Sequence, residues 1–214
     1  MKKILPLIVM MVLFTGCTAL NDKSNDEIVN TILKSNIKLF NQYRTGYKYY
    51  LPRNLTIRND EEYNEVITNK NTKYYLYIDI ISYYNKTNDE YKICSDCFYS
   101  KEISYKNKIG YLEINIINGK YLVEMMYNYA KIEVMVDKVN IKDAIINSMT
   151  ILSSIKYNDA ILTNLLVENI ISSNEELYDI FTTKKDDNII KWEKYDDEYN
   201  SKSDIYVPDL DIIK

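Results

Sequence analysis

Two cysteines that are three residues apart, Cys94 and Cys97, form the first group in this sequence that could carry chemistry. A Cys-x-x-Cys pair can be a redox centre, half of a zinc site or a small disulfide. Zinc needs two further ligands, and a redox thiol usually lies at a helix N-terminus or beside positive charge, whereas this pair encloses Asp96. The spacing therefore favours a disulfide that closes a loop and predicts no metal site, while a redox pair and free thiols stay open as alternatives.

The third cysteine, Cys17, directly follows a short apolar run. Lys2 and Lys3 precede an uncharged stretch over residues 4–14, which as a helix spans about half of the roughly 30 Å hydrocarbon core of a bilayer. A positive start, a short apolar centre and small residues after it are the parts of a secretory signal peptide. The alternative extends the run through Leu20 as an uncleaved membrane anchor. Both interpretations place the rest of the chain outside the membrane.

The residues Phe14-Thr15-Gly16-Cys17 resemble the lipobox of bacterial lipoprotein precursors, with phenylalanine where that pattern prefers leucine. The resemblance implies a diacylglycerol, typically with palmitate chains, on the Cys17 thiol. It also implies that residues 1–16 are a signal peptide that is cleaved off. Two acyl chains give a stable anchor, at about 0.8 kcal/mol per buried CH₂. We therefore expect a lipid-anchored protein on the extracytoplasmic face of the cell membrane.

Ser–His and Cys–His nucleophiles are excluded, because the chain of 214 residues contains no histidine. Residues 153–156, SSIK, have the S-x-x-K form of penicillin-binding proteins, but the same spacing recurs at residues 35–38 and no K-T-G follows. Adjacent acids such as Glu61 and Glu62 are typical of solvated surface rather than of a glycosidase pair. The sequence therefore predicts no enzyme, no catalytic residue and no cofactor.

The charge balance argues against nucleic acid as a partner. The chain has 27 basic and 31 acidic residues, and loss of Lys2 and Lys3 with the leader gives the mature chain a net charge of about −6. An acidic chain without a basic patch is a poor nucleic-acid binder. It also gains no attraction from anionic lipids, so the lipid anchor must hold it at the membrane.

Apolar periodicity predicts the helices that position these side chains. Ser24 and Glu27 have the spacing of a capping box, and apolar residues then recur at three- and four-residue steps. They predict a first helix over residues 25–44, with Gly46 suited to its C-terminal cap. Asn140 can cap a second helix. The buried stripe of that helix is predicted to be Ile141, Ile145, Met149 and Leu152.

Aromatic and β-branched runs predict the strands. Residues 47–51 and residues 73–84 are expected to be strands, and residues 155–157 a short one. Alternation within residues 73–84 assigns one face to the core. That core face comprises Tyr74, Leu76, Ile78, Ile80 and Ser82.

A hairpin is the clearest element. Asn118-Gly119 is the preferred pair for a two-residue type I′ turn, and residues 129–137 continue it into a three-strand meander. This turn pairs Ile116 with Tyr121, Ile114 with Val123 and Leu112 with Met125. It also sets Glu113 opposite Glu124, a like-charge pair on a face that should be solvated.

Tyrosines are frequent, with 22 in the chain beside 4 glycines and 3 prolines. Tyrosine has AT-rich codons and glycine and proline have GC-rich ones, so an AT-rich bacterial genome would produce this excess without selection. The number of tyrosines therefore does not indicate function, and a functional tyrosine must be identified by its position in the fold. Tyr75, Tyr77 and Tyr83 share the face opposite the predicted core side, and Tyr47 and Tyr49 could neighbour them. Exposed aromatics on a sheet can bind an envelope protein or a glycan.

The order of elements predicts an α+β fold, an antiparallel sheet with a three-strand meander packed by N-terminal and late helices. We expect a lipidated tether over residues 17–24, one domain over residues 25–183 with a last helix from Ser173, and an acidic irregular tail over residues 184–214. In residues 44–158, "GYKYYLPRNLTI", the tyrosine-rich strands and "ILSSIKYN" resemble Mog1/PsbP-like domains in element order. That resemblance implies an interaction or assembly role and carries over no site.

Together these features predict a membrane-anchored extracytoplasmic lipoprotein that acts as a non-catalytic binding or assembly factor of the cell envelope. The alternative is an envelope enzyme or a thiol redox protein. A solute binder of a transport system is less favoured, because one domain of this length leaves no second lobe to close on a ligand.

Overall fold

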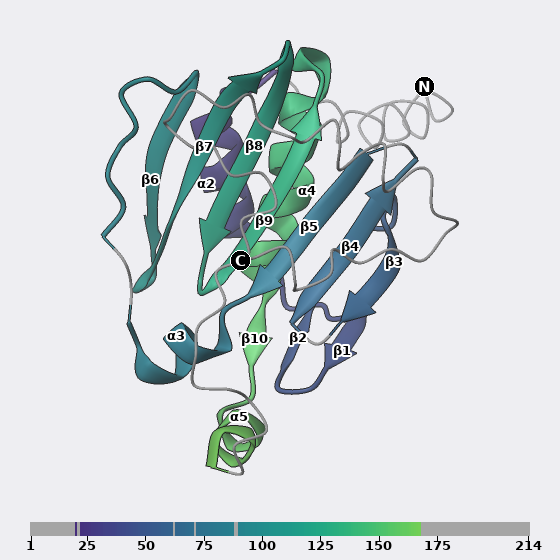
Figure 1. The fold of residues 1–214 in the computed structure, drawn as a ribbon, viewed down its shortest axis with the longest axis vertical. Helices are drawn as coiled ribbons and strands as arrows, with labels where there is room; N and C mark the ends of the chain where they lie inside the picture. Colours follow the sequence, from purple (N-terminus) through teal and green to yellow (C-terminus); the bar gives the residue numbers. More distant parts are fainter. Residues whose placement is uncertain (1–19, 21, 62, 71, 88–89, 168–214) are drawn as a thin grey trace, which may run out of the picture.

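The computed structural model describes residue 20 and residues 22–61, 63–70, 72–87 and 90–167. Cys17, the helix expected from Ser173 and the tail over residues 184–214 lie outside the described residues. Within the described ranges the fold is α+β, as predicted, with four α-helices and two all-antiparallel sheets of three and seven strands (Figure 1). No helix in these ranges is long and apolar enough to cross a membrane.

The larger sheet has seven strands in the order β3-β4-β5-β9-β8-β7-β6. Every neighbouring pair in it is antiparallel. Its strands are β3 Thr56–Glu61, β4 Asn64–Asn69, β5 Thr72–Ile78, β6 Tyr99–Tyr105, β7 Lys108–Ile117, β8 Lys120–Tyr127 and β9 Ala130–Val136.

Two-residue turns connect the four strands from β6 to β9. The predicted hairpin register, including Ile116 opposite Tyr121, is confirmed, and Asn118 and Gly119 have φ values of 48° and 79°. Positive φ at both turn residues is the type I′ geometry, whose twist matches that of the flanking strands. Lys106-Asn107 and Asn128-Tyr129 have the same geometry, with φ between 50° and 61°. The meander thus has four strands rather than three.

The first helix is shorter than predicted. α2 covers Asn25–Ser35, with both hydrogen bonds of the Ser24–Glu27 capping box present. It ends because Asn36 adopts the left-handed conformation with φ 49°, and the apolar spacing that continues to residue 43 belongs to the next segments. Gly46 is therefore not the cap of this helix, and with φ +85° it lies in the turn between two strands instead.

Those two strands belong to the smaller sheet, whose order is β1-β2-β10. β1 is Gln42–Arg44, β2 is Tyr47–Tyr49 and β10 is Lys156–Tyr157. The predicted strands at residues 47–51 and 155–157 are thus confirmed in shorter form. β1 was predicted as helix, and it becomes a strand because all three of its residues pair with β2.

The predicted strand over residues 73–84 is confirmed in its first half and wrong in its second half. β5 ends at Ile78, and residues Ile80–Asn85 form the helix α3. Asp79 causes the change, because its carboxylate accepts a hydrogen bond at 2.7 Å from the Ser82 amide and caps the helix. The predicted core side of the strand is confirmed for Tyr74, Leu76 and Ile78, which are at most 2% exposed.

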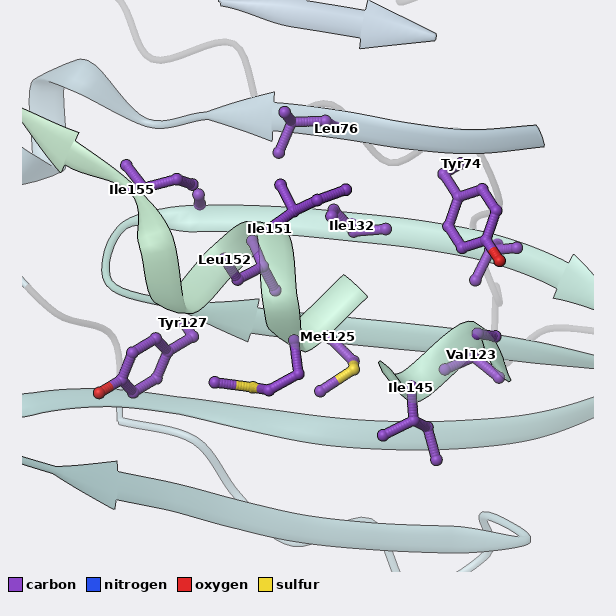
Figure 2. Close-up of a cluster of buried hydrophobic side chains, with 14 of the residues drawn as sticks. Tyr74, Leu76, Val123, Met125, Tyr127, Ile132, Ile145, Ile151, Leu152 and Ile155 are labelled. Carbon is purple, nitrogen blue, oxygen red and sulfur yellow. The ribbon is translucent and has the colours of Figure 1, made fainter. Parts of the chain in front are cut away.

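One face of the larger sheet is covered by α2 and by α4, Ile141–Ser154 (Figure 1). The four stripe residues predicted for α4 are all buried. Figure 2 shows Ile145, Ile151 and Leu152 of this helix packed against side chains of β8 and β9. Asn140 makes no side-chain capping bond and instead belongs to a 3₁₀ turn, Lys138–Asn140, that leads into α4. The helix α5, Asp159–Val167, follows β10 and was not predicted from the sequence.

A buried carboxylate joins the two sheets. Glu65 of β4, with a fully buried side chain, accepts hydrogen bonds from both Nε and Nη2 of Arg44 at 3.2 Å and from the hydroxyls of Tyr47 and Tyr49 at 3.0 and 2.5 Å. Burial and the neighbouring Glu65 carboxylate raise the pKa of Tyr47 well above its ordinary value, so it remains a donor. Tyr47 and Tyr49 thus form part of the core instead of joining the exposed tyrosines.

Candidate functional site

The face of the larger sheet opposite α2 and α4 carries two of the three tyrosines assigned to it. Tyr75 and Tyr77 lie there, half-buried, because they alternate with the buried residues of β5. From Tyr75 the cross-strand pairing continues over β9, β8 and β7 through Glu133, Glu124 and Glu113. We call these three residues the glutamate row.

The glutamate row is less solvated than predicted. Glu113 and Glu124 are half-buried and Glu133 is 2% exposed, so the expectation of a solvated face is wrong. Like charges directly opposite each other destabilise a sheet, and local partners offset this effect. Lys131 Nζ lies 3.0 Å from Glu133 Oε1, and the Tyr111 hydroxyl donates to Glu124.

A loop over residues 90–98 packs on the Glu113 end of the row. The Tyr91 ring stacks on the Tyr111 ring, with centroids 4.2 Å apart and planes 6° apart. The Tyr91 hydroxyl lies 2.8 Å from Glu113 Oε2 and 2.6 Å from Ser100 Oγ. Burial and the nearby Glu113 carboxylate raise the pKa of Tyr91 to about 12, so the phenol stays protonated at neutral pH.

The same loop contains a disulfide between Cys94 and Cys97. The Cys94 amide donates to Ser100 Oγ at 2.9 Å, which holds the disulfide against β6. The two sulfur atoms and a Glu113 oxygen lie within 4.8 Å of one another, but bonded sulfurs provide no thiolate to a metal. Residues 90–98 form no helix, so the loop lacks the helix N-terminus that lowers the pKa of redox thiols.

The prediction that Tyr83 shares a face with Tyr75 and Tyr77 is wrong, because the chain enters α3 after β5. The Tyr83 ring stacks on the Tyr157 ring at 3.8 Å, and its hydroxyl donates to Asp159 at 2.6 Å. Burial and this carboxylate raise the pKa of Tyr83 to about 12. Tyr83 therefore joins α3 to β10 and α5 rather than to the glutamate row.

A cavity of about 190 Å³ lies between α2 and β6. Lys101 Nζ lies 2.5 Å from Asp26 Oδ2 on its wall, and the Tyr99 hydroxyl also donates to Asp26. Burial raises the pKa of Asp26, but the bonds from Lys101 and Tyr99 outweigh burial and hold it below its ordinary value. A paired, ionised carboxylate is not a poised acid or base, so Asp26 is a poor candidate for a catalytic group.

The fold and this face define an antiparallel α+β protein with a disulfide-closed loop on one sheet face. In comparisons with known proteins, no family model, curated protein or solved structure matches the chain. The predicted lipid-attachment residue, Cys17, lies outside the described residues.

Sequence reasoning missed Glu133 and Tyr91 as parts of this face. Glu133 could have been found by treating Asn128-Tyr129 as a two-residue turn, because that turn places it opposite Glu124. No local signal marks Tyr91, whose position depends on how the loop folds back onto β7.

Proposed function

We propose that this chain is a lipoprotein, anchored through Cys17 to the extracytoplasmic membrane face, that binds an envelope partner without catalysis. The observation that carries the proposal is the disulfide between Cys94 and Cys97. Disulfides persist in oxidising compartments outside the cytoplasm, which supports export. This bond also uses two of the three cysteines, so Cys17 remains as the one thiol for the lipid that its lipobox-like context implies.

The sheet face around Tyr75 and Tyr77 supports the binding role. The half-buried rings share one sheet face with Lys131, Glu113 and Glu124, which are partly exposed, so this face combines apolar area with charges of both signs. Such a surface suits an envelope protein or a glycan, because both present apolar faces and hydrogen-bonding groups together. The Mog1/PsbP-like order of elements also favours an assembly role. The alternative of an envelope enzyme or thiol redox protein lacks a specific observation in its favour.

Replacing Cys17 by serine tests the anchor. Cys17→Ser removes the nucleophile for the thioether, so we expect the protein to leave the acylated membrane fraction. Fractionation should show this loss, and mass spectrometry of the wild-type membrane fraction should find an N-terminal peptide that starts at lipid-modified Cys17. A wild-type protein whose N-terminal peptide starts at an intact Met1 would contradict the anchor.

Photo-crosslinking tests the binding face. We expect a photoreactive phenylalanine at Tyr77 to yield a discrete adduct in cells, because this position is part of the proposed contact surface. Digestion of the adduct with a protease then distinguishes a protein partner from a glycan. The matched control carries the same probe at Tyr84, a tyrosine on α3 that is 44% exposed. Absence of an adduct at position 77, or equal adducts at both positions, counts against the binding role.

A further inference from the structure

One end of the larger sheet exposes large apolar side chains. It contains the β7–β8 turn and the N-termini of α2 and α4 (Figure 1). Ile116, Val139 and Phe98 are 56%, 86% and 49% exposed there. Tyr121 places these residues close to one another. It pairs with Ile116 on β7 and with Val136, the last residue of β9, and its ring lies 5.0 Å from the Phe98 ring, measured between centroids. Val139 follows β9 by three residues. We call Phe98, Ile116 and Val139 the apolar end.

The first described residues lie at this same end. The Lys23 amide donates to the Leu20 carbonyl at 3.2 Å, immediately before α2. In the first turn of α2, Asp26 bonds to Tyr99, the first residue of β6 and the neighbour of Phe98. The start of α2 therefore lies beside the apolar end.

The short segment between Cys17 and Leu20 restricts the orientation of the domain relative to the membrane. Three residues beyond Cys17 bring the chain to Leu20, and this segment spans at most about 11 Å when fully extended. A lipid on Cys17 would therefore keep the N-terminal end of α2 close to the headgroups. The opposite end, with α5, would point away from the membrane (Figure 1).

We propose that the apolar end lies against the bilayer, with Val139, Ile116 and Phe98 in the boundary between headgroups and acyl chains. The proposal rests on the proposed lipid anchor. Removal of exposed apolar surface from water stabilises the contact, and interfacial amphipathic helices bury their apolar faces about 5–10 Å deep in this boundary. Because the anchor already holds the domain at the membrane, contact of the apolar end with the bilayer is an intramolecular event. The high effective concentration of the bilayer then allows even a small apolar patch to bind.

The contact does not depend on anionic lipid. Lys120 and Lys138 are exposed around the apolar end, but so is Asp137, and the chain as a whole is acidic. Mixed charge gives no net attraction to an anionic surface, so docking should occur on zwitterionic phosphatidylcholine and change little when the salt concentration is raised.

A label at residue 139 tests the docking. In the lipidated protein Cys17 is acylated and Cys94 and Cys97 are bonded, so Val139→Cys provides a single free thiol for an environment-sensitive fluorophore. The labelled full chain is reconstituted into phosphatidylcholine vesicles with doxyl quenchers in the acyl chains. The matched control is Ile161→Cys, an apolar position on α5 that is 41% exposed at the opposite end. We expect several-fold stronger quenching at position 139 than at position 161.

Flotation of the vesicles distinguishes failure of the anchor from failure of the docking. A protein that does not float with vesicles overturns the anchor and, with it, the docking. A protein that floats but is quenched equally at both positions overturns the docking alone. Self-crosslinking of the unlabelled Val139→Cys variant, without lipid quenching, would assign the apolar end to a second copy of the chain and would also overturn the docking.

Discussion

Glu65→Ala is expected to lower the free energy of unfolding by about 3–5 kcal/mol, the usual effect of removing one partner of a buried ion pair. The change leaves the Arg44 guanidinium and the hydroxyls of Tyr47 and Tyr49 without their shared acceptor. These groups connect the smaller sheet to β4, so β1 and β2 lose their link to the larger sheet. Urea unfolding followed by circular dichroism measures the effect.

Two further variants separate loss of the buried carboxylate from general effects of substitution. Glu102→Ala removes an exposed glutamate from β6 and should change the stability by less than about 0.5 kcal/mol. Glu65→Gln retains the size and one acceptor oxygen, so its stability should lie between Glu65→Ala and wild type. An unfolding midpoint for Glu65→Ala equal to that of Glu102→Ala would show that the buried carboxylate contributes nothing to stability.

Gly110→Ala should be the second strongly destabilising substitution, by about 3 kcal/mol, the upper end of the usual cost of overpacking. A Cβ atom at Gly110 would lie 2.0 Å from the Met126 carbonyl oxygen and 2.8 Å from Tyr127 Cα, both in the backbone of β8. A backbone atom cannot rotate away as a side chain does. The substitution therefore forces β7 and β8 apart where Gly110 pairs with Tyr127, the last residue of β8, and thermal unfolding should detect the loss of stability.

Gly119→Ala provides the matched comparison. Gly119 has φ +79°, and a Cβ atom there would have no neighbour within 4 Å, so the alanine meets conformational strain without a clash. An L-residue in this left-handed conformation costs roughly 1–2 kcal/mol. If the two alanine variants lose equal stability, close approach of the β7 and β8 backbones is not what requires glycine at position 110.

Elements set by local interactions agree with their sequence patterns. The Asn118-Gly119 turn has two residues, so once it forms the register of β7 on β8 has no freedom to shift. The capping box at Ser24 likewise marks the start of α2, because its hydrogen bonds connect residues three apart. The buried stripe of α4 follows from helical periodicity alone.

Elements that depend on distant partners differ from their sequence patterns. Residues Gln42–Arg44 continue an apolar helical spacing, yet they form a strand because β2 pairs with them and β4 supplies Glu65 as the partner of Arg44. The misassignment of Ile80–Asn85 has a different cause. The Asp79 cap that starts this helix connects residues only three apart, but the aromatic and β-branched content of the segment favours a strand in the sequence pattern. The error over Tyr83 follows directly from that one misassigned helix.

Some features of the candidate face follow from local sequence, and others depend on distant partners. Alternation within β5 was enough to place Tyr75 and Tyr77 away from the core, and the hairpin register was enough to oppose Glu113 and Glu124. The burial of the glutamate row required the loop that carries Tyr91 and the Tyr111 hydroxyl, which reaches Glu124 on the neighbouring strand. Those two contacts join residues 22 and 13 positions apart, so neither has a local signature.

Local sequence was therefore sufficient for the α+β class and for the register of the β7–β8 hairpin. Only the tertiary structure placed β5 beside β9, buried Glu65 between two sheets and brought the start of α2 beside Phe98, Ile116 and Val139. The physical reason is that periodicity, caps and two-residue turns act within a few residues. Strand order, buried ion pairs and exposed patches instead depend on which elements pack together to bury their apolar faces.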